Sequence, residues 1–209
     1  MKTTTSRSDT IKPMDEDAEL ITQHDTGDTA AFDTLVKRAL PQVWRFARRM
    51  VGSDDEAEDV VQETFVKAWR YLPRFERGKN FRTWVLSIAR NTAIDMLRKK
   101  RGITLSRFDD DEGGNVLIDT LADDELLPDE LAVRAENAET LERVIVQLPD
   151  PAREIILLRY QEGLTFEEIA ESIGEPLNTV KSRGRRALVA LKKLLEKIAP
   201  KGDTTAYTQ

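Results

Sequence analysis

The chain has 209 residues, a formal net charge of -6, 33% charged residues and only 6% aromatic residues, and its low glycine and proline content favours an all-α fold. It has no cysteine and one histidine, His24, which excludes disulfides, thiolate metal sites and a histidine-based triad. No stretch approaches the roughly 18 apolar residues of a membrane span and residues 1–11 lack a signal-peptide core, so we expect a cytoplasmic protein without metal or other cofactor.

The N-terminal part of the chain shows apolar residues at helical spacing. Residues 1–14 and 201–209 are short of apolar side chains and are expected to form tails. From residue 15 to residue 101 the apolar residues recur at intervals of three and four, which predicts one helical domain. Breaks between its helices are expected at Pro41, at Gly52 to Asp54 and at Pro73 to Asn80. Ser53 or Asp54 can cap the helix that follows the second break.

An acidic segment follows this domain. Residues 28–101 contain 16 basic and 10 acidic residues, whereas residues 102–139 contain 2 and 12. Like charges and glycines disfavour a packed helix, so residues 102–130 are expected to form an extended acidic linker. Composition alone favours a solvated spacer, and a function for the acidity stays open.

Helical spacing resumes near residue 131, and residues 131–200 are predicted to form a second small domain. Thr165 and Glu168 have the spacing of a capping box, in which the threonine hydroxyl accepts a hydrogen bond from the glutamate backbone N–H. Gly174 allows a tight turn, and Pro176 suits the entry to the next helix. Two helices joined by so short a turn predict a helix-turn-helix.

The helix after this turn has two contrasting faces. Val180, Ala187 and Leu191 share an apolar face, on which Gly184 would permit the close approach of a neighbouring helix. The opposite face carries side chains that can reach base edges and phosphates, namely Asn178, Ser182, Arg185 and Arg186. A solvated basic face is the alternative, and a run of Lys and Arg alone would favour it. The capped turn favours DNA recognition.

Three segments resemble the sigma-70 family of bacterial transcription initiation factors. Residues 176–188 resemble the recognition helix of sigma region 4, residues 55–69 resemble region 2.2, and residues 81–95 resemble regions 2.3 and 2.4. Because only regions 2 and 4 are present, joined by a short acidic linker, the chain is identified as a member of the extracytoplasmic function (ECF) group. The resemblance covers about residues 25–198.

The resemblance implies three sets of contact residues. A face that docks on the clamp helices of core RNA polymerase would consist of Asp59, Gln62, Glu63 and Val66, with Val61 and Phe65 turned inward. Binding of the minus-ten element and strand opening would involve Lys79, Asn80, Phe81, Asn91, Asp95, Arg98 and Arg101. The minus-thirty-five element would be read by Asn178, Thr179, Lys181, Ser182, Arg185 and Arg186. For Trp84 we expect a core position, and for Lys79 and Asn80 a solvated turn is an equally good interpretation.

The resemblance therefore implies a sigma factor that binds core RNA polymerase, directs it to promoters and promotes DNA melting. The resemblance also implies that the factor responds to stress and is held by an anti-sigma factor. It further implies that the carboxylates of the acidic linker mimic phosphates inside the polymerase channels. The expected partners are core RNA polymerase, promoter DNA and an anti-sigma factor, with no membrane insertion and no small-molecule substrate. No enzymatic activity is expected, because no nucleophile, base and orienting group can be assembled. A stand-alone regulator, dimeric on a palindromic site, and an adaptor without DNA binding are the alternatives, and co-elution with core polymerase would separate them.

Overall fold

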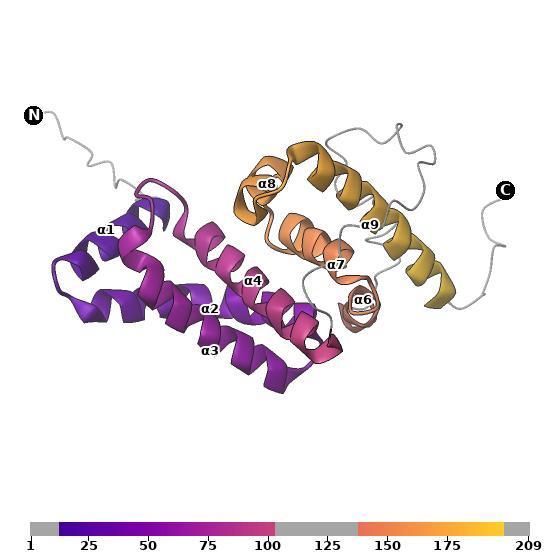
Figure 1. Ribbon diagram of the computed structural model, residues 1–209, viewed down its shortest axis with the longest axis horizontal. Helices are drawn as coiled ribbons and strands as arrows, with labels where there is room; N and C mark the ends of the chain where they lie inside the picture. The colour runs from indigo at the N-terminus through magenta and orange to yellow at the C-terminus, as the bar shows by residue number, and fades with distance from the viewer. Residues whose placement is uncertain (1–12, 103–137, 199–209) are drawn as a thin grey trace, which may run out of the picture.

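The computed structural model describes residues 13–102 and 138–198, and within these ranges it is helical without strands. The first bundle comprises α1 (Pro13–Asp25), α2 (Thr29–Val51), α3 (Asp54–Tyr71), a 3-10 turn (Leu72–Arg74) and α4 (Phe81–Arg101). The second bundle comprises α6 (Ala138–Ile145), α7 (Asp150–Ile156), a π-helical turn (Leu157–Gln161), α8 (Phe166–Ile173) and α9 (Leu177–Ile198). In Figure 1 the second bundle lies beside α4 of the first. The predicted all-α fold with two helical domains is confirmed. Apart from Gly102 and residues 13–14, the expected linker (102–130) and tails lie outside the described residues.

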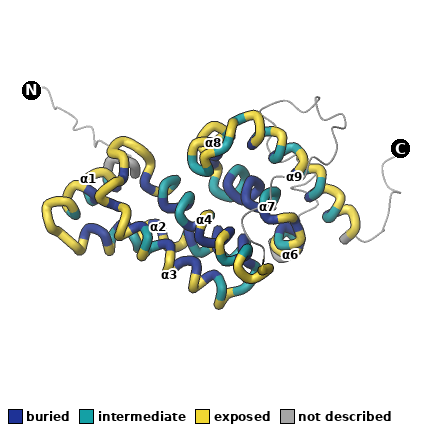
Figure 2. Tube along the Cα trace, in the orientation of Figure 1, coloured by how far each residue is buried: buried dark blue, intermediate teal, exposed yellow. Residues whose placement is uncertain are grey.

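The core of the first bundle is built around α2, which packs against α1, α3 and α4. Its residues Leu35, Val43, Phe46 and Met50 are fully buried. Figure 2 shows buried positions alternating with exposed ones along the helices of this bundle. Burial of each such side chain stabilises the fold by about 1.5–3 kcal/mol. The core therefore holds α3 and α4 in place, and these are the helices that carry the predicted contact residues of this bundle.

Pro41 does not interrupt the helix, contrary to the sequence prediction: α2 continues through it from Thr29 to Val51. A proline inside a helix removes the hydrogen bond to the carbonyl four residues earlier, here that of Lys37. Both Pro41 and Lys37 are exposed, so water can satisfy that carbonyl. The apolar residues before and after Pro41 also stay in phase on one buried face, and their packing offsets the lost bond.

The other two predicted breaks of the first bundle occur where expected. α2 ends at Gly52, whose backbone is left-handed with a φ of 85°. Ser53 is the N-cap of α3, although its hydroxyl makes no capping hydrogen bond. The side chain of Asn80 caps α4 and accepts hydrogen bonds from the backbone N–H groups of Arg82 and Thr83 at 2.9 and 3.2 Å. Asn80 therefore fixes the start of α4, directly after the loop that carries Lys79.

The helix-turn-helix of the second bundle has the predicted local structure. The Thr165 hydroxyl accepts the Glu168 N–H at 3.1 Å, and the Glu168 carboxylate accepts the Thr165 N–H at 2.8 Å, so the capping box is complete. α8 ends at Gly174, which is left-handed with a φ of 71°. A Cβ on Gly184 would lie only 2.9 Å from a ring carbon of Phe166, which confirms that this glycine permits close packing of α8 on α9.

The short helix α7 lies at the centre of the second bundle and is buried on several sides. Residues Ile155, Ile156, Leu157 and Leu158 are consecutive and all buried, and so are the charged residues Arg153 and Glu154. Consecutive residues of a helix point in different directions. Neighbours must therefore cover α7 on several sides, and these include α9 of its own bundle and α2 of the first bundle.

Candidate polymerase and nucleic-acid interface

The outward face of α3 is exposed as the sequence predicted. Its four predicted contact residues, Asp59, Gln62, Glu63 and Val66, are all solvent-exposed. Val61 and Ala68 on the other side of the helix are buried, and Phe65 is half-buried. Val66 has 51% of its surface exposed. An exposed apolar side chain flanked by acidic and amide groups suits a protein interface.

Trp69 extends this face and was not singled out from the sequence. It is 46% exposed, and its ring packs edge-on against Phe32 and His24, with centroid distances of 4.9 and 5.0 Å. It follows Val66 by three residues, so the two side chains are neighbours on the helix surface. That spacing of large apolar residues on an otherwise polar face was the signal that could have revealed it. We call the exposed face of α3, from Asp59 to Trp69, the α3 face.

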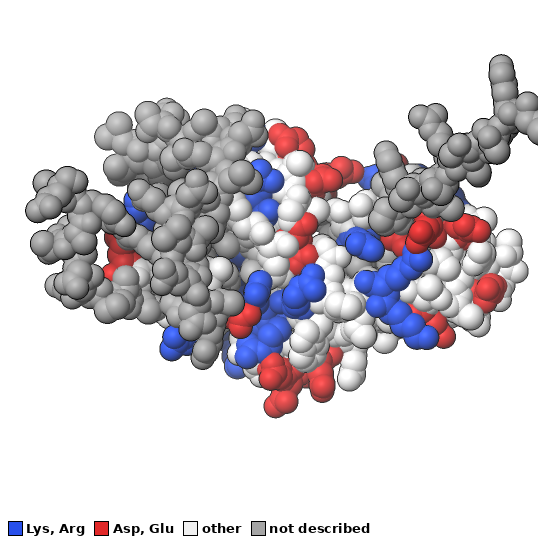
Figure 3. All heavy atoms as spheres, turned by 180° about the vertical axis from the view of Figure 1, so that it is seen from behind, with Lys and Arg blue, Asp and Glu red and all other residues white. Residues whose placement is uncertain are grey.

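The residues predicted for strand opening lie on the loop before α4 and along α4 itself. Among them Lys79, Asn80, Asn91, Asp95 and Arg101 are exposed, and Arg98 is half-buried. We call these six residues the strand-opening surface. Figure 3 shows the face of the molecule opposite to that in Figure 1, where Lys and Arg side chains are interspersed with Asp and Glu. The strand-opening surface itself includes the exposed carboxylate of Asp95, so it is not uniformly positive.

Phe81 belongs to the core instead of the surface. It is only 2% exposed, and its ring packs against those of Phe75 and Trp84, with centroid distances of 6.1 and 5.7 Å. A nucleotide base cannot stack on it in this conformation, so the prediction of a direct contact is not supported by its position. Trp84 is half-buried in the same aromatic cluster, in line with the core position expected for it.

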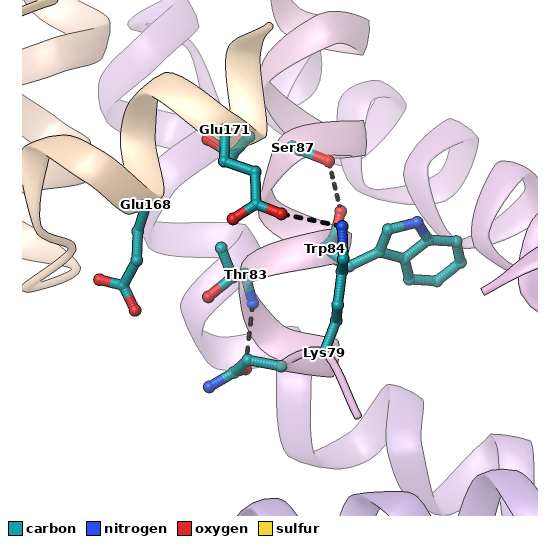
Figure 4. Close-up of a pocket in the computed structure, with 8 residues that line it drawn as sticks. Lys79, Thr83, Trp84, Ser87, Glu168 and Glu171 are labelled. Carbon is teal, nitrogen blue, oxygen red and sulfur yellow. Dashed lines mark hydrogen bonds and ion pairs between the residues drawn. The ribbon is translucent and has the colours of Figure 1, made fainter. Parts of the chain in front are cut away.

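Lys79 lies between two carboxylates. Its ammonium group is 2.9 Å from Glu76 on its own loop and 2.8 Å from Glu171 on α8. The hydrogen bond to Glu171, followed by that to Glu76, raises the pKa of Lys79 above its ordinary value, so the side chain stays charged. Lys79 and Glu171 line a cavity of about 270 Å³ between α4 and α8, and Figure 4 shows the two side chains meeting across it.

Arg90 also connects the two bundles and was missed by the sequence reasoning. Its guanidinium binds the carboxylate of Glu154 on α7 at 2.7 and 3.0 Å, and its remaining nitrogen donates to the side chain of Asn91 at 2.9 Å. A paired interaction of this kind is stronger than a single neutral hydrogen bond. In the sequence, only the position of Arg90 next to Asn91 pointed to a role for it, because no nearby residue identifies Glu154 as its partner.

The outer face of α9 presents the residues predicted for the minus-thirty-five element. Asn178, Thr179, Ser182 and Arg186 are exposed, whereas Lys181 and Arg185 are half-buried. Arg186 donates weakly to Ser182 at 3.4 Å, and Lys181 is 3.9 Å from Glu167 of α8. Val180, Ala187 and Leu191 are buried on the inner face, as predicted. The exposed side chains lie in the first half of α9, which is where recognition helices contact bases.

Two kinds of site are absent from the described residues. No group of three or more histidine, aspartate or glutamate side chains in residues 13–102 and 138–198 could hold a metal ion. Within the same ranges no helix has both the length and the apolar character needed to cross a membrane.

Both bundles match known protein families. Residues 35–103 match the family Sigma-70 region 2, and residues 138–191 match Sigma-70, region 4. Together the fold and these matches show that the chain belongs to the sigma-70 family of RNA polymerase sigma factors, in its ECF group.

Two relatives match most of the chain. It is 34% identical to the ECF RNA polymerase sigma factor SigW of Bacillus subtilis over 84% of this chain and 94% of that protein. It is 36% identical to the ECF RNA polymerase sigma-E factor of Escherichia coli over 84% and 92% of the two chains.

Two solved structures of protein complexes contain chains similar to this one. One is the sigma factor RpoE with the anti-sigma factor NepR from Bartonella quintana, with a TM-score of 0.58, 26% identity and coverage of 79% of this chain and 96% of that one. The other is CnrH with the cytosolic domain of CnrY, with a TM-score of 0.62, 27% identity and coverage of 88% and 99%.

Proposed function

We propose that the chain binds core RNA polymerase, directs it to specific promoters and promotes DNA melting, without catalysing a reaction of its own. The observation that carries this proposal is the combination on one chain of a capped helix-turn-helix with an exposed polar and basic face and, on α3, of a separate exposed face that includes two large apolar side chains, Val66 and Trp69. A DNA-binding regulator would need only the first. The exposed apolar side chains of the α3 face, Val66 and Trp69, support a protein partner as well.

The division of labour between the two bundles follows from their chemistry. The first half of α9 offers amide, hydroxyl and guanidinium groups, which suit direct reading of base edges in the major groove. The strand-opening surface offers Asn91, exposed and beside Arg90, which suits hydrogen bonding to an unpaired base. Phe81 is proposed to act indirectly, because its buried ring supports the loop that carries Lys79 and Asn80.

Control by an anti-sigma factor is part of the proposal. Its support is that the similar RpoE structure was solved in complex with the anti-sigma factor NepR. Stress-responsive expression of the target genes is proposed by the same analogy with ECF factors.

Run-off transcription tests the function directly. Core polymerase is incubated with genomic promoter fragments with and without the purified chain, and new transcripts with defined start sites are expected only when the chain is present. Arg186→Ala is expected to reduce these transcripts, whereas Lys193→Ala, a change of the same charge on an exposed residue further along α9, is expected to leave most of them. If the transcripts are the same with and without the chain, the proposal is wrong.

A further inference from the structure

The loop of residues 75–80, which carries Lys79, is fixed at both of its ends. Phe75 at its start and Phe81 directly after it are buried, and the side chain of Asn80 caps α4. Between these anchors residues 76–79 are all exposed. A segment with few buried contacts opens easily unless other interactions hold it. The polar contacts of residues 76–79 therefore decide how firmly this loop is placed.

A cavity of about 160 Å³ lies between the loop and α1. Its walls include Thr22 of α1 and Arg77, Gly78 and Lys79 of the loop. A Cβ on Gly78 would meet no atom within 4 Å, so the tip of the loop is not packed against its surroundings. Packing therefore does little to hold the loop.

Arg77 joins the loop to the end of α1. Its guanidinium forms an ion pair with the carboxylate of Asp25 and donates a hydrogen bond to the hydroxyl of Thr22 at 3.0 Å. The same hydroxyl donates to the carbonyl of Ala18 at 2.9 Å, so its proton is used and its oxygen is left to accept from Arg77. The guanidinium is thus held at two points of α1, one of them a charge-assisted contact.

The helix α1 is a firm support for this contact. Ile21 is 3% exposed and belongs to the core, and Asp17 binds Arg38 of α2 at 3.1 Å. Asp17 also lies 4.0 Å from Arg82 in the first turn of α4. α1 is therefore fixed to α2 and to the helix that follows the loop. It precedes residue 35, at which the match to Sigma-70 region 2 begins.

The pair of Asp25 and Arg77 is placed to order the loop and not to stabilise the bundle. Asp25 is the last residue of α1, where a negative charge opposes the helix dipole. The side chains of Arg77 and Asp25 are 56% and 33% exposed, and ion pairs this exposed contribute little to the stability of a domain. Loss of the pair should therefore loosen the loop while the helices stay folded.

We infer that Arg77 is a positioning residue for strand opening: its contacts with Asp25 and Thr22 of α1 hold the loop in the conformation in which Lys79 and Asn80 meet the separated DNA strand. The inference rests on the proposed function for the role of this loop. A loop that is already ordered binds an unpaired base more tightly, because ordering it adds no further cost on binding. The alternative is that Arg77 itself binds a DNA phosphate.

A change of Asp25 separates these two roles by the sign of its effect. Asp25→Ala takes the net charge from -6 to -5, which by charge alone favours DNA binding, and it would also free Arg77 for a phosphate. We expect the reverse. With core polymerase on a promoter found by run-off transcription, permanganate reactivity of the opened strand should be about three- to ten-fold lower, because less of the loop is in the competent conformation. Binding to core polymerase should not change. Asp33→Ala, the same charge change on an exposed residue of α2, is the matched control and should behave as the parent chain.

A charge swap gives a second test. Arg77→Asp places two carboxylates together and should reduce strand opening at least as much as Asp25→Ala does. Arg77→Asp combined with Asp25→Arg restores an opposite-charge pair and should recover most of the permanganate reactivity. A phosphate contact of Arg77 could not be recovered in this way, because position 77 then carries a carboxylate.

The order of the loop is measured on the full chain without polymerase. Nitrogen-15 relaxation gives order parameters for the backbone N–H groups of residues 76–79. We expect lower values in Asp25→Ala and Arg77→Asp and a return to the parent values in the double variant, with unchanged helix content by circular dichroism.

The inference is overturned if Asp25→Ala opens the promoter as well as Asp33→Ala does, if the double variant is as defective as Arg77→Asp, or if Arg77→Asp leaves the order parameters unchanged. Failure of the proposed function would look different. The parent chain would then start no transcripts with core polymerase, while the order parameters would still report whether Arg77 holds the loop.

Discussion

Arg153 is expected to be among the most important residues for the stability of the second bundle. Its side chain is 6% exposed, and it donates to the backbone carbonyls of Ile145, Met50, Val146 and Leu148. The nearest carboxylate is that of Asp150, at 3.7 Å. Burial lowers the pKa of Arg153, opposed by Asp150 and assisted by Arg101, so carbonyl dipoles provide much of the compensation for its charge.

Arg153→Met keeps most of the aliphatic length and removes all of these donors. A hydrogen bond to a charged group contributes about 1.5–3 kcal/mol, but the substitution also removes the cost of burying the guanidinium, which is several kcal/mol. Up to four carbonyls are left without this donor. We expect a net loss of about 3–5 kcal/mol in the free energy of unfolding, which is a large part of the ~5–15 kcal/mol of a typical domain.

Urea unfolding followed by circular dichroism measures this loss. The control is Arg143→Met, which makes the same substitution on an exposed residue of α6 and should change the free energy of unfolding by no more than about 0.5 kcal/mol. Arg153→Lys should lie between the two, because a compact ammonium keeps the charge but cannot reach carbonyls spread over the α6–α7 turn and α2. If Arg153→Met loses less than about 1 kcal/mol, the carbonyls do not depend on this side chain and the reasoning is wrong.

Three further predictions concern the proposed interfaces. Glu63→Arg should weaken binding to core polymerase about ten-fold in a fluorescence titration without loss of helicity. Glu19→Arg, the same change on an exposed residue of α1, should not; equal effects would contradict the assigned face. Asn91→Ala should reduce permanganate reactivity of the open promoter more than it reduces closed-complex formation, and an unchanged footprint would count against a contact with an unpaired base. Arg186→Ala should reduce the free energy of promoter binding by about 1–3 kcal/mol and relax the sequence preference at one base pair, measured on a panel of single-base promoter variants. Lys193→Ala should lower only the salt dependence of DNA binding, by about one phosphate contact. If Arg186→Ala weakens binding equally for every promoter variant, Arg186 contacts a phosphate and not a base.

The parts of the structure that depend on neighbouring residues could be predicted from the sequence. Thr165 and Glu168 define the start of α8 because a capping box is completed within one turn of the chain. Gly174 marks its end because few other residues adopt a left-handed backbone without strain. Gly184 was predicted to permit close packing because a glycine on an apolar helix face has little other use, although the sequence did not identify Phe166 as its neighbour.

The parts that depend on distant residues could not be predicted. Pro41 was expected to end a helix because its local effect is unfavourable, but packing along the whole of α2 outweighs that effect. The pairing of Arg90 with Glu154 joins residues 64 positions apart, and no spacing rule reveals such a contact. Phe81 was assigned to strand opening by resemblance, whereas it is buried at the start of α4, a helix that packs on α1 and α2.

Because α7 is buried on several sides, hydrogen exchange of its backbone amides can report on structural opening in either bundle. Backbone amides exchange with deuterium only when the structure around them opens, at a rate set by the free energy of that opening. Helices at a domain surface exchange through local fraying, but the amides of Arg153 to Leu158 lie beneath both α9 and the first bundle. Their exchange should therefore respond to events in either bundle. Mass spectrometry of a single peptide from this segment can follow the encounter of the intact, unlabelled protein with any partner that draws the two bundles apart.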